Sequence, residues 1–398
     1  MSCMNLNYTK VKDSYLFAGI RERIDAWLQA NPGKKILRLG IGDVTQPLCP
    51  SVIRALHEAV EDQAHAESFH GYMPECGDPA LRQAIAQWYR QRNIPVDWQE
   101  VFVSSGASDE LGDILHLFDR SLPAMIPEPA YPAYVDANIM DGREVICLDA
   151  SPENDFLPLP PVTEVQALIY LCSPDNPTGS VCTRACLEQW VSYAARTGSV
   201  ILFDAAYESF VSDEDIPRSI YEIAGAYACA IEISSLSKTA GFTGTRCGYT
   251  VIPQKLVRDG LSLNAMWVRN RTTRTNGISC IIQKGALAVF SEEGQKEVRQ
   301  LHEIYRRNAQ NFMQALAAAG LSYTGGKNSP YIWMKCPGNL GSWEMFDLLL
   351  QQAQVAATPG VGFGSSGEGW IRFSMFADEA DIQEAGRRII RLRNEKVF

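Results

Sequence analysis

Short apolar runs alternate with amphipathic stretches through the middle of the chain. The apolar runs cover residues 101–105, 124–129, 144–149, 167–174, 199–207 and 230–235. They are brief and rich in β-forming residues, as strands buried on both faces should be. Residues 50–65, 78–93 and 183–198 repeat apolar positions at a period of 3.6, which predicts helices, the second with Asp78 as N-cap and Pro79 in its first turn. This alternation predicts an α/β fold, with a mostly parallel sheet sandwiched by helices.

The pattern changes after about residue 283. A long helical region, 284–320, is followed by a strand-like segment, a helix at 342–355, a glycine-rich loop and a second strand-like segment. We therefore expect two domains, because 398 residues exceed the usual size of one core. Residues 48–282 would form a large α/β domain, and residues 1–47 with 283–398 a smaller α+β domain.

Composition narrows the range of partners. The formal net charge of −10 leaves no basic surface on average for a nucleic-acid backbone. No apolar run approaches the roughly 20 residues that span a bilayer, and the first residues resemble neither a secretory signal nor a transit peptide. We therefore expect no nucleic acid, no membrane and a cytoplasmic location.

The eleven cysteines are scattered and odd in number, which favours reduced thiols. Cys182 and Cys186 lie one helical turn apart, but no histidine is near them in the sequence. Packing in a core is therefore a better interpretation of this pair than metal binding, and we expect no metal site.

Polar residues stand where several predicted strands end. Open parallel sheets bind ligands at the carboxyl ends of their strands. The residues concerned are Asn176 in "SPDNPTG", Asp204 with Tyr207 in "FDAAY", Ser235, Ser237 and Lys238 in "SLSK", and Arg246 in "GTR". Each has an ordinary explanation when taken alone: a helix cap or ion pair for Asp204, a turn for "NPTG", and a surface position for Lys238. The combination of these residues, in this order along the chain, requires a different explanation.

Two glycine-containing loops have different meanings. "VFVSSGASDE" leaves a predicted strand, turns at Gly106 and enters a helix, so its amides and hydroxyls could cradle a phosphate. "GFGSSG" at 362–367 matches a dinucleotide fingerprint, but a strand-like segment follows it where a helix would be required. We interpret the second match as accidental.

The joint motif of Asn176, Asp204 with Tyr207, Ser235-x-x-Lys238 and Arg246 resembles that of the fold type I, pyridoxal-phosphate-dependent aminotransferases. Within that superfamily the chain is similar to the LL-diaminopimelate aminotransferase family over nearly its whole length. The similar segments are "SYLF", "RLGIGDVTQPL", "HGYMPECG", "YPAYVD", "SPDNPTG", "LFDAAYESFVSD", "IPRSIYEI", "SLSKTAGFTGTR" and "TVIP". The resemblance implies a homodimer with shared active sites, and pyridoxal 5'-phosphate as cofactor.

The resemblance also implies roles for single residues around the cofactor. Lys238 would bind the aldehyde covalently and move the proton, and Asp204 would pair with the pyridine nitrogen. Tyr207 and Asn176 would hydrogen-bond the phenolic oxygen, and Tyr131 would stack on the ring. The phosphate would be held by Ala107, Ser108, Ser235, Ser237 and Arg246, together with Tyr72 from the neighbouring subunit.

For the substrate, the resemblance implies that Arg372 binds the α-carboxylate with help from Asn176 and Gly42. The ordinary alternative for Arg372 is an edge-strand arginine in a salt bridge, which the surrounding match disfavours. Tyr15, Glu75 and Asn276 would recognise the far end of the substrate, the last two across the dimer interface. Tyr72 and Tyr131 would also line the substrate position.

The chain departs from the family at the phosphate turn. The usual "DGAK" is "SGAS" here, with Ser105 and Ser108 in place of the aspartate and lysine. The leading hypothesis is an LL-diaminopimelate aminotransferase that works in ping-pong order with 2-oxoglutarate, in lysine and peptidoglycan-precursor biosynthesis. The alternatives are a related aminotransferase with another or a broad amino donor, such as lysine or other diamino or aromatic acids, and a non-catalytic relative.

Overall fold

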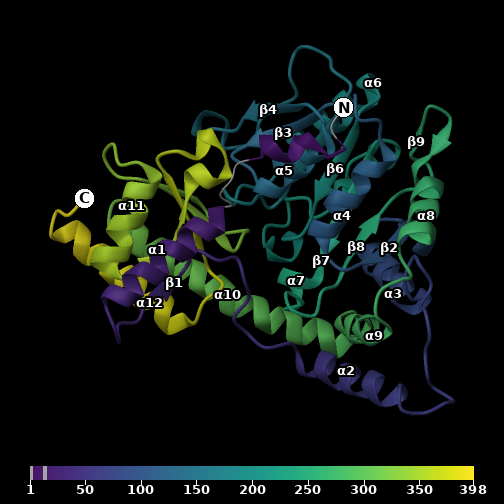
Figure 1. Cartoon of the computed structure of the whole chain (residues 1–398), viewed down its shortest axis with the longest axis horizontal. Helices are drawn as coiled ribbons and strands as arrows, with labels where there is room; N and C mark the ends of the chain where they lie inside the picture. Colours follow the sequence, from purple (N-terminus) through teal and green to yellow (C-terminus); the bar gives the residue numbers. More distant parts are fainter. Residues whose placement is uncertain (1–2, 12–15) are drawn as a thin grey trace.

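The computed structural model describes residues 3–11 and 16–398. Its largest sheet has seven strands, most of which are labelled in Figure 1. The strand order is β2-β8-β7-β6-β5-β3-β4. β8 runs antiparallel to both of its neighbours, and the other pairs are parallel. The strands are β2 (Val101–Ser104), β3 (Ala124–Glu128), β4 (Val145–Asp149), β5 (Leu168–Cys172), β6 (Val200–Asp204), β7 (Ala230–Ser235) and β8 (Gly248–Val251). The six strands predicted from the sequence are confirmed, and β8 was missed.

Both faces of this sheet are buried. Along β6, Ile201 and Phe203 belong to one apolar core, whereas Val200 and Leu202 belong to another. Successive strand residues point to opposite faces, so this strand must be apolar at every position. The flanking helices are α2 (Pro50–Asp62), α3 (Pro79–Arg90), α4 (Ala107–Asp113), α5 (Pro132–Asp141), α6 (Arg184–Thr197), α7 (Leu236–Thr239), α8 (Leu263–Arg274) and α9 (Cys280–Val289). The α/β class is therefore confirmed.

Two local predictions, one about a helix cap and one about a glycine-rich turn, are also confirmed. Asp78 caps α3 by accepting a hydrogen bond from the amide of Ala80 at 2.8 Å, and Pro79 is the first helical residue. The turn at 362–367 leads into β15 rather than a helix.

A second, antiparallel sheet has the order β11-β12-β15-β14. Its strands are β11 (Tyr323–Gly325), β12 (Tyr331–Lys335), β14 (Thr358–Pro359) and β15 (Trp370–Ser374), and α1 (Leu16–Ala30), α11 (Ser342–Leu348) and α12 (Glu379–Asn394) belong to the same part of the chain. The N-terminal segment joins it, since β1 (Leu37–Arg38) pairs with β13 (Val355–Ala356) and Ile20 and Ile24 lie in its core. The division into 48–282 and 1–47 with 283–398 stays a prediction; position 283 falls inside α9, and Val298 packs in the core of the first sheet.

The remaining regular elements are short. β9 (Val257–Arg258) and β10 (Leu261–Ser262) form a hairpin. Single 3-10 turns occupy Leu6–Lys10, Trp98–Glu100, Ile114–Leu117, Pro152–Asn154, Glu208–Phe210, Ile220–Glu222, Ala226–Ala228, Gly360–Phe363 and Ser365–Gly367, and a π turn occupies Leu349–Ala353. Within residues 3–11 and 16–398, no helix has both the length and the apolar character needed to cross a bilayer.

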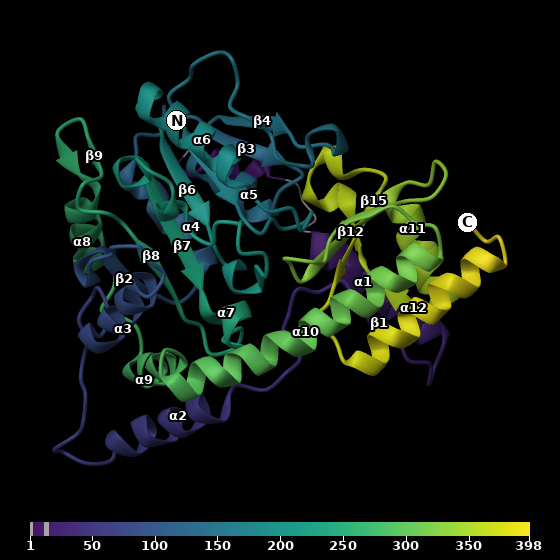
Figure 2. The ribbon, with the colours of Figure 1, turned by 180° about the vertical axis from the view of Figure 1, so that it is seen from behind.

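The helical region expected at 284–320 is two helices rather than one. α9 ends at Val289, and α10 (Glu292–Ala318) starts after Ser291, whose hydroxyl accepts a hydrogen bond from the amide of Gly294 at 3.0 Å. The corner is tight, because a Cβ at Gly294 would lie 2.0 Å from the carbonyl oxygen of Ala288. α10 then runs from the first sheet to the second (Figure 2), with Val298 in one core and Phe312 in the other.

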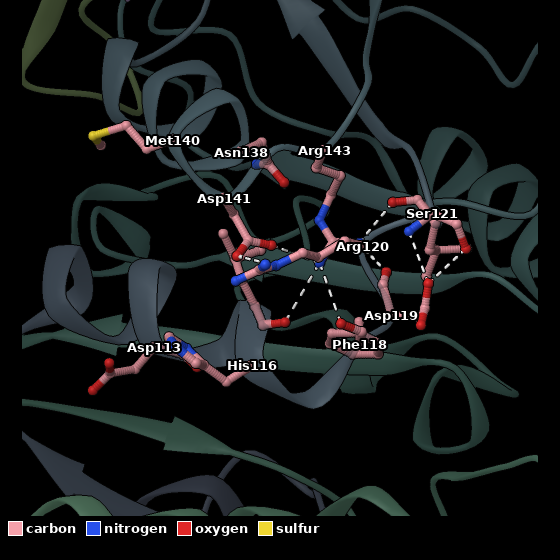
Figure 3. Close-up of polar contacts among 12 residues, drawn as sticks. Asp113, His116, Phe118, Asp119, Arg120, Ser121, Asn138, Met140, Asp141 and Arg143 are labelled. Atoms are coloured by element: carbon pink, nitrogen blue, oxygen red, sulfur yellow. Dashed lines mark hydrogen bonds and ion pairs between the residues drawn. The ribbon is translucent and has the colours of Figure 1, made fainter. Parts of the chain in front are cut away.

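Arg143 ties the turn after α5 to the segment that precedes β3 (Figure 3). Its side chain is fully buried, and its Nη1 donates to the carbonyl oxygens of Asp119 at 2.5 Å and Leu122 at 2.7 Å. Its Nη2 pairs with the carboxylate of Asp141 at 3.1 Å. One guanidinium therefore satisfies backbone and carboxylate oxygens that would otherwise lack partners.

We expect Arg143→Met to lower the free energy of unfolding by about 3 kcal/mol, because it leaves buried oxygens without a donor. Arg120→Met is the matched control, since Arg120 also pairs with Asp141, at 3.2 Å, but is 74% exposed. The control should change stability by less than about 1 kcal/mol. Urea unfolding of both variants measures the difference, and equal losses would contradict this account of Arg143.

Candidate active site

A cavity of about 410 Å³ lies at the carboxyl ends of β5, β6 and β7 and is also lined by residues of the second sheet. Chain segments that are far apart in sequence meet here, because the carboxyl ends of parallel strands share one edge of the sheet. Twelve of the residues expected from the sequence line it: Gly42, Ala107, Ser108, Tyr131, Asn176, Asp204, Tyr207, Ser235, Ser237, Lys238, Arg246 and Arg372.

Four expected residues do not line this cavity. Tyr72, Glu75 and Asn276 are exposed on the surface of the single chain, and Tyr72 has 88% of its surface accessible. Tyr15 lies outside the described residues. The first three are those expected to act wholly or partly across a dimer interface, which a single chain does not test.

Asp204 is a buried carboxylate at the end of β6. The hydroxyl of Tyr134 donates to its Oδ2 at 2.6 Å, and the amide of Ala206 donates to its Oδ1 at 2.9 Å. Burial raises the pKa of Asp204, and these two hydrogen bonds oppose the rise. Within the described part of the chain, no lysine, arginine or histidine forms an ion pair with it. A buried carboxylate in this setting calls for a cationic partner.

Lys238 lies on α7, directly after β7. The short helix is capped by Ser235, whose hydroxyl accepts from the amide of Ser237 at 3.1 Å. The pKa of Lys238 is lowered from 10.5 to about 8, first by burial and also by the charges of Arg372 and Arg246, against the opposing effect of Asp43. Because only the neutral amine is nucleophilic, this environment activates Lys238 near physiological pH.

The lowered pKa predicts the pH dependence of aldehyde capture by the apoprotein. Below pH 8 Lys238 is mostly an ammonium ion, and above it mostly a free amine, so capture should rise with pH around a midpoint of about 8. From pH 7 to pH 8 the neutral fraction increases about fivefold. Rapid borohydride trapping after adding an aldehyde, followed by peptide mapping, measures the rate at Lys238, with exposed Lys296 as the internal reference. A midpoint near 10.5 would contradict this assignment.

Arg246 and the start of α4 form a second polar corner of the cavity. β2 leads through Gly106 into α4, as predicted from the sequence. A Cβ at Gly106 would lie 2.6 Å from Nη2 of Arg246, so glycine is needed for the arginine to lie against this turn. Nη1 of Arg246 donates to the hydroxyl of Ser237 at 3.4 Å and the carbonyl of Thr243 at 3.2 Å. A guanidinium, hydroxyls and helix-start amides together suit a dianionic group.

Arg372 approaches the cavity from β15 and is only 2% exposed. Its Nη1 donates to Oδ1 of Asn176 and its Nη2 to the carbonyl of Gly40, both at 2.7 Å. The guanidinium carbon lies 4.4 Å from the ring centre of Tyr331. The alternative of an edge-strand arginine is wrong, because β15 pairs with β12 on one side and β14 on the other.

Seven of the lining residues were not predicted from the sequence, and three of them bear on the chemistry of the site. Tyr134 lies one helical turn after Tyr131, so the spacing within "YPAYVD" could have indicated it. Tyr331, whose hydroxyl lies 2.9 Å from that of Tyr207, stands in a strand of the other sheet and carries no local signal. Asp43 directly follows Gly42 in the chain, but only Gly42 was assigned a role from the sequence.

The fold and this lysine-centred cavity define an aminotransferase. The family model described as "Aminotransferase class I and II" matches residues 34–389, and the chain belongs to that family.

Individual relatives indicate which kind of aminotransferase this chain is similar to. The chain is 45% identical to the LL-diaminopimelate aminotransferase of Lachnospira eligens, covering 97% of this chain and 98% of the relative. It is also 45% identical to the enzyme of that name from Lawsonia intracellularis, covering 98% of each chain. Among solved structures, the L,L-diaminopimelate aminotransferase of Chlamydomonas reinhardtii superposes with a TM-score of 0.92 at 38% identity, over 97% of this chain and 98% of the other.

Proposed function

We propose that this chain is an LL-2,6-diaminopimelate:2-oxoglutarate aminotransferase that uses pyridoxal 5'-phosphate and works in ping-pong order in the cytoplasm. It would convert tetrahydrodipicolinate to LL-diaminopimelate while glutamate becomes 2-oxoglutarate, and the reverse. This reaction would supply lysine and peptidoglycan precursors. The proposal is supported by 45% identity to relatives of that name over nearly the whole chain.

The observation that carries the cofactor assignment is the buried carboxylate of Asp204. It lacks a cationic partner within the described chain, yet it lines the same cavity as the activated amine of Lys238. A protonated pyridine nitrogen supplies that partner, and the corner formed by Arg246, Ser237 and the start of α4 suits the phosphate. Pyridoxal phosphate contributes an aldehyde that binds amino groups and a ring that accepts the electron pair from Cα.

Each residue of the cavity is then assigned a separate role. Lys238 would hold the aldehyde of the bound coenzyme, and its amine would move a proton between Cα of the amino acid and C4′ of the coenzyme. Asp204 would pair with the protonated ring nitrogen of the coenzyme, and Tyr134 orients that carboxylate through its 2.6 Å hydrogen bond. Tyr207 and Asn176 are assigned to the phenolic oxygen, and Tyr131 to the ring face. The phosphate is assigned to Ala107, Ser108, Ser235, Ser237 and Arg246.

Arg372 is assigned to the substrate α-carboxylate, with Asn176 and Gly42. Its bonds to Asn176 and to the carbonyl of Gly40 fix the plane of the guanidinium before substrate arrives. A fixed planar fork binds a carboxylate with two parallel hydrogen bonds and loses little entropy in doing so.

Tyr72, Glu75 and Asn276 are proposed to complete the active site of a partner subunit. All three are exposed on the single chain, where a tyrosine with 88% of its surface accessible contributes little to stability. Glu75 would offer a carboxylate to the distal ammonium of diaminopimelate. Tyr15 is proposed for the same far end of the substrate.

We expect Tyr72→Ala to weaken coenzyme binding about tenfold, by loss of one hydrogen bond to a charged phosphate. The unfolding free energy of the apoprotein should change by less than about 0.5 kcal/mol. Tyr8→Ala, at an exposed tyrosine without an assigned role, is the control and should leave coenzyme affinity unchanged.

A mixing experiment tests whether the site is shared. Subunits carrying Tyr72→Ala and subunits carrying Lys238→Ala are unfolded and refolded together at a coenzyme concentration that saturates only the natural protein. Each hybrid dimer regains one complete site, so activity should exceed the sum of the two separate variants. Activity equal to that sum would contradict a site shared between subunits.

An amino-donor panel with 2-oxoglutarate as acceptor tests the substrate. We expect the purified holoenzyme to use LL-diaminopimelate with the highest kcat/KM, well above meso-diaminopimelate, lysine and aromatic amino acids. Brisk turnover of another donor with none of the LL isomer would contradict the proposal.

A second candidate, a broader or different amino donor, is favoured by one feature of the cavity. Its lining cations are Lys238, Arg246 and Arg372, all of which already have roles, while Ser108 stands where the family has lysine. Among the residues that the structure describes, no lining cation is then left for a distal carboxylate. Ser108→Lys decides between the two, because restored charge should raise kcat/KM for diaminopimelate relative to lysine if the distal carboxylate is read there.

A further inference from the structure

A second cavity of about 690 Å³ lies between α7 and the first turns of α10, and we call it the α10 cavity. It is lined by Trp88, Arg218, Leu236, Thr239, Val298 and Arg299, among others. Ser234 lines the α10 cavity whereas Ser235 lines the active site. Consecutive strand residues point to opposite faces of a sheet, so the two cavities lie on opposite faces. Substrates in the active site therefore do not occupy the α10 cavity.

The α10 cavity has an excess of positive charge. Arg306 is paired with Glu303 at 2.5 Å, and Glu208 with Arg92 at 3.1 Å. Arg218 and Arg299, in contrast, form no ion pair with any described residue. Two guanidiniums are therefore available to an anion in a chain whose formal net charge is −10.

The other groups at the cavity contribute no further charge. Nε2 of His302 donates a hydrogen bond to the carbonyl oxygen of Thr239 at 2.8 Å, and burial lowers the pKa of His302 to about 4, so the ring is neutral. Arg218 uses one Nη2 hydrogen bond on the carbonyl of Val211 at 2.7 Å, which fixes the side chain and leaves its other donors for a ligand.

The walls of the cavity are apolar and aromatic. They include Trp88, Leu236, Val289, Phe290 and Val298. Cavities of about 300–1,000 Å³ with apolar walls and a few charged groups typically bind small organic molecules. Free arginines favour a carboxylate with bidentate geometry, and the apolar walls favour an aromatic or similarly sized apolar body.

The α10 cavity is connected to the active site through α7. Leu236 and Thr239 line the α10 cavity, and between them Ser237 and Lys238 line the active site. Thr239 is held by His302 of α10 and by the hydroxyl of Ser209 at 3.2 Å. A molecule in the α10 cavity therefore touches the same helical turn that carries the reactive amine.

We propose that the α10 cavity is an effector site for a small carboxylate on an aromatic-sized apolar body, held by Arg299 and Arg218 and coupled to the active site through α7. Binding there does not compete with the amino donor, and it changes kcat.

The test is a titration of the holoenzyme with naphthalene-2-carboxylate, followed by calorimetry. We expect one molecule to bind per chain and the neutral naphthalene-2-carboxamide to bind at least about tenfold more weakly. Arg299→Gln and Arg218→Gln should each weaken carboxylate binding about tenfold. Lys296→Gln removes the same charge from an exposed position of α10 outside the cavity lining, and should change affinity less than twofold.

Kinetics and a competing anion complete the test. The probe should change kcat at saturating amino donor in the natural protein, and this change should be lost in Arg299→Gln, which replaces an exposed side chain. Unaltered binding in Arg299→Gln, displacement of the probe by the amino donor, or an unchanged kcat would overturn the proposal. Inorganic phosphate binding as tightly as the carboxylate would overturn the assigned ligand class.

Discussion

Replacing Lys238 by alanine lowers kcat by about 10⁴-fold or more, because one amine provides both the nucleophile and the proton-transfer group. The fold should survive the change. At pH 7 the folded chain disfavours the ammonium form of Lys238, whose pKa falls from 10.5 to about 8, so the lysine reduces folding stability and alanine removes that cost. Single-turnover kinetics, with thermal unfolding of the apoprotein in parallel, measures both effects.

Lys296→Ala is the control for this variant, since Lys296 is exposed on α10 and lines neither cavity. It should retain full activity. Added primary amines should restore part of the activity of Lys238→Ala by supplying a base from solution. A Lys238→Ala protein with more than about a hundredth of the natural kcat would contradict the role of Lys238.

The second large effect concerns Asp204. Asp204→Asn keeps the size of the side chain and can still accept the hydrogen bond from Tyr134, but it has no charge to hold a proton on a ring nitrogen. Loss of one member of a buried charged pair costs about 3–5 kcal/mol, which corresponds to roughly 160- to 5,000-fold in kcat. Stopped-flow measurement of the half-reaction with LL-diaminopimelate gives this value directly.

A matched change at the exposed Asp215 provides the comparison. Asp215→Asn should leave the half-reaction unchanged and should bind the coenzyme as the natural protein does. Rescue also separates a charge effect from a packing effect. A coenzyme analogue with a permanently methylated, positively charged ring nitrogen should recover activity in Asp204→Asn. A fully active Asp204→Asn protein without the analogue would contradict the assigned ion pair.

The sequence predicted the elements whose burial is simple. β6 reads as a continuous apolar run because both faces of its sheet are covered, and Asp78 marks the start of α3 because a free amide needs a cap. β8 was missed because four residues, Gly248–Val251, carry too weak a pattern, and Gly248 is required by close packing on the carbonyl of Ser234. The break between α9 and α10 depends on a single serine cap, which a helical period does not reveal.

The candidate site likewise contains residues that the sequence could predict and residues that it could not. Asp204 and Lys238 stand at or just after the ends of β6 and β7, so their proximity follows from the parallel sheet. Arg246 precedes β8, which is antiparallel and therefore begins at the same edge. Tyr331 reaches the cavity from the second sheet, and no local pattern indicates how the two sheets pack. The exposure of Tyr72, Glu75 and Asn276 likewise has no explanation within one chain.

The central claim is that the coenzyme aldehyde is bound covalently by the amine of Lys238. Borohydride reduction of the purified holoenzyme, followed by digestion and mass spectrometry, tests it most directly. The account predicts that the pyridoxyl phosphate group is found on the peptide containing Lys238 and on no other. Its attachment to a different lysine, or an unmodified Lys238 peptide after complete reduction, would contradict the account.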